Sequence, residues 1–304
     1  AAPASLATFT VTGALIGLGR TRQVLVVQLV LNGLNIFLDI LFAGVLGWGV
    51  RGIALGTALA EWTAVGIGLW LLHGVLRRER QDSEPWWPTA RLRDMTRARA
   101  MLGANADIMI RTLFLLLGFG WFTNQGALFG PVILAANHVL LQLITLSAYL
   151  LDGFAHATEI LVGRAVGSGA RDALRDAVRR STEIAALTAL AFAGVALLAG
   201  SWAIARLTNL PPVREMAEAF LPYAAAYIML SWAAFQLDGI FIGATATRAM
   251  RNASVVSCLA FIAVSLPLIA RWGNTGLWIA MIGFVIARAV ALGVAYPRVV
   301  AAVE

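Results

Sequence analysis

The sequence predicts an all-α integral membrane protein, and three observations support this prediction. Hydrophobic residues make up 60% of the 304 residues, charged residues make up 13%, and the mean hydropathy is +0.81. Soluble domains are roughly half apolar and a quarter charged, so lipid must cover much of this protein's surface. The apolar residues fall into runs of about 20, the length that spans a bilayer as a helix. Polar residues inside these runs recur at helical spacing.

Nine apolar runs are predicted to span the membrane. They cover roughly residues 1–18, 23–46, 52–76, 101–123, 129–154, 183–205, 216–243, 253–270 and 275–297. The net charge of +7 reflects arginines that gather after the first, third, fifth, seventh and ninth runs. The positive-inside rule places these segments and the C-terminus in the cytoplasm, which predicts a multi-pass protein of a bacterial or archaeal inner membrane. Arginines in such positions do not indicate a nucleic-acid partner.

A repeat relates the first three runs to the last three. LIGLGRTR at 15–22 is similar to FIGATATR at 241–248, and each stretch is followed by a span and then by a tryptophan–glycine turn. Because the two copies have the same orientation, the repeating unit is six helices, as in transporters with two parallel halves. Two such units need twelve helices, so three further helices are expected before residue 1.

These boundaries divide the chain into three parts. Residues 1–78 are predicted to be the remaining three helices of an N-terminal lobe, and 101–304 the six helices of a C-terminal lobe. Residues 79–100 are predicted to form the cytoplasmic loop between them, because this is the longest and most charged connection.

The second run carries one polar stripe on an otherwise apolar helix. At helical spacing, Gln28, Asn32, Asn35 and Asp39 fall within a narrow arc. Asn35, Asp39 and Thr57 are expected at one depth, since Asp39 and Thr57 are similarly distant from the turn between the second and third runs. An amide, a carboxylate and a hydroxyl suit Na⁺, or a proton on Asp39. The same side chains could instead join helices without a role in transport.

The fifth run has a longer polar stripe, at spacings of three or four residues. It comprises His138, Gln142, Thr145, Tyr149, Asp152, His156 and Glu159. Lipid would not tolerate these side chains on an outer face, so this helix is expected to line water or a polar cavity.

Other spans also contain ionisable residues, for which a functional role is the default expectation. Asp107 and Arg111 are one turn apart and are expected to neutralise each other. Arg288 has no partner nearby in the sequence, and Asp238 and Glu61 are the candidates to pair with it. The predicted cavity or substrate path contains Asn32, Glu61, Asp107, Arg111, His138, Gln142, Tyr149, Asp152 and Asp238.

Sequence motifs of enzymes are missing. The sequence contains no zinc-protease pair, nucleophile elbow or P-loop. The single cysteine, Cys258, lies in an apolar run, so neither a disulfide nor a thiolate metal site is available. We therefore expect a monomer that is not an enzyme and needs no cofactor besides a coupling ion, H⁺ or Na⁺.

Three stretches together carry a family resemblance. They are LNIFLDILF at 34–42, LDGFAHATEILVGRAVGSG at 151–169 and LDGIFIGATATRAMRN at 237–252. The chain resembles the multidrug and toxin extrusion family, in its DinF-like branch. The resemblance implies two six-helix lobes around a cavity, and export of cationic, amphipathic compounds in exchange for Na⁺ or H⁺ by alternating access. In DinF-like members an Asn and an Asp one turn apart combine with a Thr on the next helix, and Asn35, Asp39 and Thr57 are similar to these positions.

Two alternatives remain open. A flippase for lipid-linked precursors, from the same broader superfamily, would share the fold but need a more cationic cavity to hold pyrophosphate. A membrane scaffold that transports nothing would not need the polar stripe of the fifth run. The mixed intramembrane charges favour the exporter of cationic, small-molecule substrates.

Overall fold

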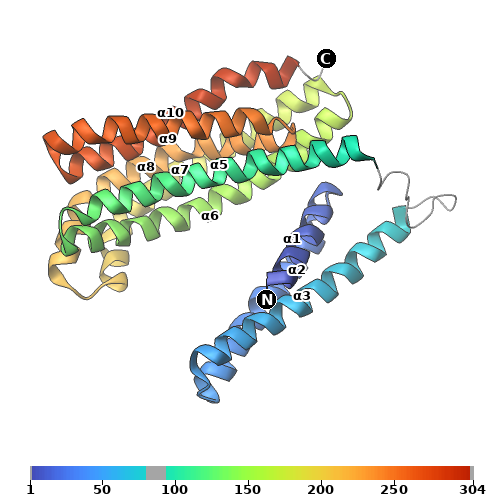
Figure 1. Ribbon diagram of the computed structural model, residues 1–304, viewed down its shortest axis with the longest axis horizontal. Coiled ribbons are helices and arrows are strands. Elements are labelled where there is room, and N and C mark those ends of the chain that lie inside the picture. The colour runs from blue at the N-terminus through green and yellow to red at the C-terminus, as the bar shows by residue number, and fades with distance from the viewer. Residues whose placement is uncertain (1, 80–93, 302–304) are drawn as a thin grey trace. The chain divides into compact units, whose positions relative to one another are not determined.

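The computed structural model describes residues 2–79 and 94–301, and within them the chain divides into two compact units. The first unit comprises residues 1–94 and the second 95–304. The described residues form nine α-helices and no strand, one helix being continued by a π-helix (Figure 1). The predicted all-α fold class is confirmed.

The N-terminal unit contains three α-helices and the π-helix. They are α1 (Ala2–Gly17), α2 (Thr21–Asp39), η1 (Ile40–Val45) and α3 (Gly49–Glu79). A small apolar cluster joins the three α-helices, with Val11 and Leu15 from α1, Val27 from α2, and Ala64 and Val75 from α3. This packing holds the polar residues of α2 against α3.

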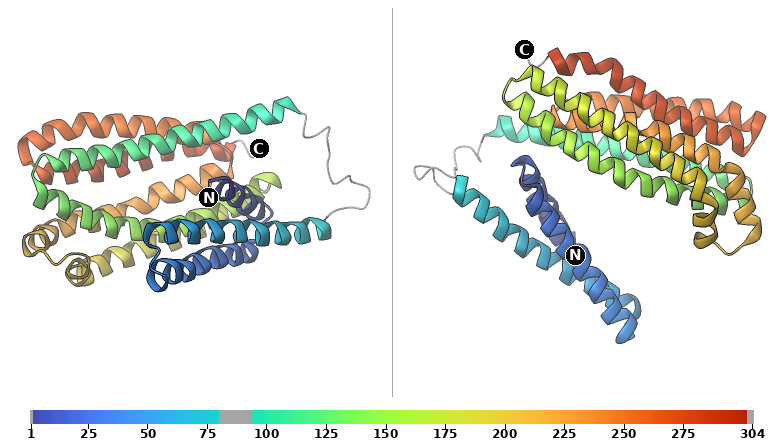
Figure 2. Two further views of the ribbon diagram at one scale, coloured as in Figure 1. Left: turned by 60° about the horizontal axis from the view of Figure 1, so that its bottom comes forward. Right: turned by 180° about the vertical axis from the view of Figure 1, so that it is seen from behind.

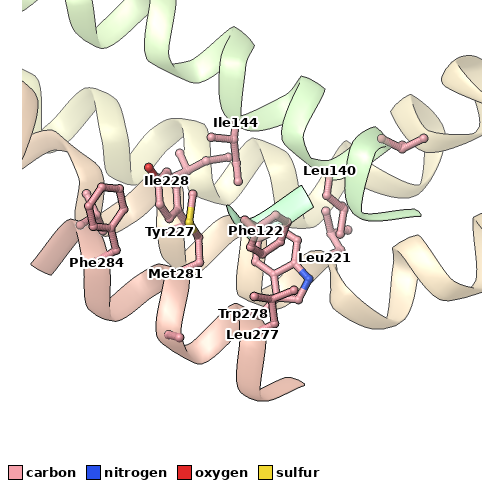
Figure 3. Packing of buried hydrophobic residues seen from close by; sticks show 14 of the residues in the cluster. Phe122, Leu140, Ile144, Leu221, Tyr227, Ile228, Leu277, Trp278, Met281 and Phe284 are labelled. Carbon is pink, nitrogen blue, oxygen red and sulfur yellow. The ribbon is translucent and has the colours of Figure 1, made fainter. Parts of the chain in front are cut away.

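The C-terminal unit is a bundle of six long helices. They are α5 (Met95–Ala127), α6 (Pro131–Gly167), α7 (Arg171–Leu207), α8 (Pro211–Gly243), α9 (Thr247–Trp272) and α10 (Asn274–Ala301). Both views in Figure 2 show them running side by side. Figure 3 shows the largest apolar cluster of this unit, where Phe122, Tyr227, Trp278 and Phe284 meet leucines and isoleucines of α6 and α8.

Lengths and surfaces of the helices fit a bilayer. Within residues 2–79 and 94–301, eight helices are long and apolar enough to cross a membrane, and α1, with 16 residues, is a shorter apolar helix. Large apolar side chains lie on the outside, for example Leu198 at 91% exposure and Trp70 at 73%. In water such a surface would be unfavourable, whereas lipid chains cover it at no cost. The described part of the chain is therefore a multi-pass membrane protein.

The predicted spans are shorter than the helices. Segments predicted as loops, at 155–182 and at the end of the inter-lobe loop, are largely helical, and only Ser168–Ala170 separate α6 from α7. The apolar runs mark only the roughly 30 Å hydrocarbon layer, while the hydrogen bonds of a helix continue into the headgroup region. Residues 80–93 of the predicted inter-lobe loop lie outside the described residues.

The turns at the two copies of the predicted repeat are alike in detail. The backbone N–H of Arg20 donates to Leu15 O, and that of Ala246 to Phe241 O, both over 2.8 Å. The residues before them, Gly19 and Thr245, have φ of +67° and +56°. A threonine in this conformation is unusual. The turn after α6 has the same hydrogen-bond pattern, so this likeness is not specific to the repeat, which stays a prediction.

Candidate functional site

The predicted ion site lies where α2 faces α3 in the N-terminal unit. Asn35 Nδ2 donates a hydrogen bond of 3.1 Å to Thr57 Oγ1, and both residues are half-buried. The structure thus brings together two of the three side chains that the sequence places at one depth.

Asp39, the third residue, is the last residue of α2 and lies against α3 at Gly56. A Cβ atom added to Gly56 would lie only 2.7 Å from Asp39 Oδ1, so the absence of a side chain there lets the carboxylate reach the neighbour of Thr57. Asp39 Oδ1 is buried and has no hydrogen-bond partner among the described residues. A buried carboxylate oxygen without a donor is costly unless it binds a proton or a cation.

The π-helix η1 begins directly after Asp39. Leu46 N donates to Leu41 O over 2.9 Å, five residues back, where an α-helix would use the carbonyl four residues back. Segments of π-helix are rare and occur frequently at functional sites. Sequence reasoning missed both η1 and the role of Gly56, because neither leaves a recognisable pattern.

Two polar residues near this site have other partners. Glu61 Oε2 accepts a hydrogen bond of 3.4 Å from Thr8 Oγ1 in α1. Asn32 is exposed, and its Nδ2 donates to Gln28 O in its own helix over 2.9 Å. Glu61 therefore ties α3 to α1, whereas the described contacts of Asn32 stay within α2. Thr8 and Thr12, one turn apart and both buried, were missed in the sequence.

The C-terminal unit contains a buried ion cluster that joins three helices. Asp238 Oδ2 in α8 accepts hydrogen bonds from Nη2 of Arg111 in α5 and from Nη2 of Arg288 in α10. Asp238 and Arg288 are only 4% and 5% exposed. Of the two candidates named for Arg288, the structure shows Asp238 as a partner.

The expected pair of Asp107 with Arg111 is wrong. Asp107 Oδ1 accepts from Arg251 Nη1 over 2.6 Å, and its Oδ2 accepts from Thr247 Oγ1 over 3.0 Å. A pair one turn apart on a helix contributes only about 0.2–0.5 kcal/mol, which buried contacts from other helices readily exceed. Asp107 therefore joins α5 to α9, and Arg111 is directed to Asp238.

A pocket of about 290 Å³ opens beside this cluster, between α5, α6, α8 and α10. Arg111, Arg288 and Asp152 line it together with the hydroxyl-bearing residues Thr145 and Tyr227. Asp238 itself is not among the lining residues. The pocket therefore presents the two guanidinium groups, while the carboxylate that holds them lies behind.

The polar stripe predicted in the fifth run lies on α6, on one surface of the C-terminal unit. His138, Gln142, Thr145, Tyr149, Asp152 and His156 are exposed, and Glu159 is half-buried. Within the stripe, His138 Nε2 lies 3.3 Å from Gln142 Nε2, and His156 Nδ1 lies 3.3 Å from Glu159 Oε2. Thr145, Tyr149 and Asp152 extend from this surface to the pocket.

Next to the stripe, α6 packs against α8 at backbone distance. A Cβ on Gly239 would lie 2.3 Å from Ala155 O, and one on Gly243 would lie 2.5 Å from Glu159 O. Small residues permit such approach between membrane helices.

A buried hydrogen-bond network lies in the same region, where Gln236 accepts from Thr158 over 3.1 Å and donates to Ser181 over 2.6 Å. Sequence reasoning missed this network, whose three residues are far apart in the chain.

Comparison with known proteins identifies the family. The sequence matches the family model described as MatE over residues 110–267, more than half of the chain. The chain belongs to the MatE family. The resemblance of the three sequence stretches to this family is thereby confirmed.

Two curated relatives extend the match over nearly the whole chain. The chain is 36% identical over 299 residues to DNA damage-inducible protein F of Escherichia coli, covering 98% of this chain and 64% of the relative. It is 31% identical over 291 residues to the probable multidrug resistance protein NorM of Deinococcus radiodurans, covering 90% of this chain and 61% of the relative. This MatE-family chain thus spans less than two thirds of the length of either relative.

Solved structures show the same fold. A crystal structure of a MATE protein in the straight conformation has a TM-score of 0.85 and 18% identity, covering 97% of this chain and 66% of the other. The Vibrio cholerae MATE transporter VcmN in the bent form has a TM-score of 0.83 and 16% identity, with the same coverage. At these identities the likeness shows the fold alone.

Proposed function

We propose that this chain is part of a secondary antiporter that exports amphipathic organic molecules, cationic compounds among them, in exchange for H⁺ or Na⁺. Membership of the MatE family supports the transporter class. The observation that carries the proposal is the buried, unpaired Oδ1 of the half-buried Asp39, beside the Asn35–Thr57 pair and before a π-helix. The transporter functions in an inner membrane with its C-terminus in the cytoplasm, because arginines cluster at that end of the helices.

In this proposal, Asp39 is the residue that couples ion binding to export of the cargo. In one state the carboxylate is charged and binds Na⁺ with oxygens of Asn35 and Thr57; in the other it carries a proton. Na⁺ favours such oxygen ligands, as hard cations do. Because charge at a buried position changes which helix arrangement is stable, each form favours a different conformation. The described residues contain no cluster of three or more His, Cys, Asp or Glu side chains that would suit a transition metal.

The test is efflux of a cationic dye from drug-sensitive cells that express the protein, with and without a Na⁺ or pH gradient. Asp39→Asn is expected to abolish gradient-driven efflux, because the amide neither takes up a proton nor carries the negative charge that balances a bound cation. Asp176→Asn, which removes an exposed carboxylate of α7, is the matched control and should leave efflux unchanged. Membrane levels of both variants are measured by immunoblot. Efflux by Asp39→Asn at the wild-type rate would contradict the assignment.

A flippase for lipid-linked precursors is the second candidate, favoured by the two arginines that line the C-terminal pocket. The charges of Asp152 and Asp238 offset those of the two arginines, so the site has no excess positive charge to balance a pyrophosphate. We therefore place the antiporter first. Dye efflux that fails at confirmed membrane expression, together with transfer of a lipid-linked pyrophosphate across vesicles, would reverse this order.

A further inference from the structure

The pocket of the C-terminal unit has a charge pattern that a cationic cargo does not explain. Two guanidinium groups share one oxygen of Asp238, so the three side chains together carry one excess positive charge. Nε of Arg111 and Nε of Arg288 are both buried, so the pocket meets these two arginines through their other atoms. A guanidinium group at the wall of a pocket favours an anion, and arginine binds carboxylates with two parallel hydrogen bonds.

The two arginines are held in position from behind the pocket. Arg288 pairs with Asp238 and lies over the ring of Phe235, with 5.7 Å from its Cζ to the ring centroid. Arg111 shares the same carboxylate and has a side chain 17% exposed, against 5% for Arg288. Asp238 therefore fixes both cations from a position outside the pocket lining, and Arg111 is the more accessible of the two.

The remaining walls suit an aromatic or aliphatic body. Leu115, Phe119 and Ile144 line the pocket, and Tyr227 and Ser231 add hydroxyl groups. A volume of about 290 Å³ is at the lower end of the roughly 300–1,000 Å³ typical of ligand sites, enough for one ring and an acidic group. Asp152 lines the same pocket on the exposed polar face of α6, where it opposes binding of an anion.

We propose that this pocket binds the carboxylate of amphipathic organic acids, with Arg111 as the direct contact and Arg288 behind it. The proposal adds a substrate class to the proposed function and rests on it for transport. The binding step concerns the C-terminal unit alone and requires neither Asp39 nor a gradient. A molecule with both an acidic and a basic group would use this pocket for its acidic end.

The experiment is equilibrium binding of three matched radiolabelled probes to the purified protein in phosphatidylcholine nanodiscs, with empty nanodiscs subtracted. The probes are 4-phenylbutyrate, its neutral amide and the corresponding amine, which share one apolar body with a single ring. Wild-type protein is expected to bind the carboxylate about tenfold more tightly than the amide, the effect of one charge-assisted hydrogen bond. A preference for the amine, or equal affinities for all three probes, would overturn the proposal.

Variants assign the preference to this pocket. Arg111→Gln should remove the preference for the carboxylate and leave binding of the amide unchanged, because the Arg288–Asp238 pair remains neutral. Asp152→Asn, at an exposed position, should tighten carboxylate binding about threefold by removing a repelling charge. Arg179→Gln removes an exposed arginine of α7 that pairs with Glu183, and it should change neither affinity.

The outcomes separate this proposal from the proposed function. Carboxylate binding that survives Arg111→Gln, or that is unchanged in Asp152→Asn, rules out the pocket even if dye efflux is intact. If carboxylate binding depends on Arg111 but the protein exports no dye, the result supports the binding pocket and contradicts only the proposed antiporter function. Thermal unfolding of each variant shows that a lost preference does not reflect a misfolded protein.

Discussion

At the residue scale, Gly56 determines whether Asp39 can occupy its site. No larger side chain fits between the α3 backbone and Asp39 Oδ1, whereas Gly66 in the same helix has no atom within 4 Å of an added Cβ. The two glycines therefore separate the role of the site from the general effect of glycine in a helix.

Gly56→Ala is expected to reduce gradient-driven efflux severalfold, because its methyl group displaces the carboxylate of Asp39. Gly66→Ala should leave efflux intact and stabilise α3 slightly, since alanine is favoured over glycine in a helix by about 1 kcal/mol. The measurement is dye efflux at matched membrane levels. Equal efflux by the two variants would show that contact between Asp39 and α3 has no role in coupling.

A second residue-scale prediction concerns Asp238. Replacing it by alanine leaves the buried guanidinium group of Arg288 without its carboxylate, a loss of roughly 3–5 kcal/mol in the free energy of unfolding. Glu183→Ala removes the carboxylate of the exposed pair with Arg179 and should not shift the melting temperature measurably. Thermal unfolding in detergent checks both, and an unchanged melting temperature for Asp238→Ala would mean that the cluster is not buried as described.

At the scale of elements, the helices could be predicted from the sequence and their ends could not. Each of the nine predicted spans corresponds to one helix, because about 20 apolar residues in a row leave few alternatives. From α3 onward the helices extend beyond the apolar runs, since their ends lie among polar headgroups and no longer need apolar side chains. The π-helix after Asp39 depends on tertiary contacts, which apolar periodicity does not encode.

The same contrast applies to the side chains of the candidate sites. Counting residues from one short turn predicts Thr57 at the depth of Asp39, and Asn35 lies one helical turn from Asp39, so the sequence alone brings these side chains near one another. The partners of Asp107 and Arg111 come from α9 and α8, more than a hundred residues away in the chain. A single sequence carries no signal for such pairs, and the nearest opposite charge was the wrong choice.

An element-scale prediction tests the packing of α6 on α8. Gly239→Ala places a Cβ against the backbone carbonyl of Ala155, and a backbone atom cannot move aside as a flexible side chain can. The expected loss is about 1–3 kcal/mol in the free energy of unfolding, typical of overpacking. Gly153→Ala in α6, with no atom within 4 Å of the new Cβ, is the control and should be neutral. Thermal unfolding measures both.

At the scale of the whole molecule, the proposed orientation in the membrane rests on charge alone and can be tested chemically. Cys258 is buried, so new exposed cysteines can be labelled over a low background. Ser168→Cys lies in the turn between α6 and α7, next to arginines, and Asn209→Cys lies in the turn between α7 and α8. A membrane-impermeant maleimide should label Asn209→Cys in intact cells and Ser168→Cys only after permeabilisation. The reverse pattern would invert the proposed topology.

The close contact of α6 with α8 also limits how the C-terminal unit can move. With the carbonyl oxygens of Ala155 and Glu159 at contact distance from α8, α6 cannot roll about its own axis without a collision between backbones. Its polar face is consequently a permanent feature of this unit and not one that a rotating helix could hide. Any change in what water or cargo meets along this face therefore requires that α6 moves together with α8, or that other helices move relative to this pair.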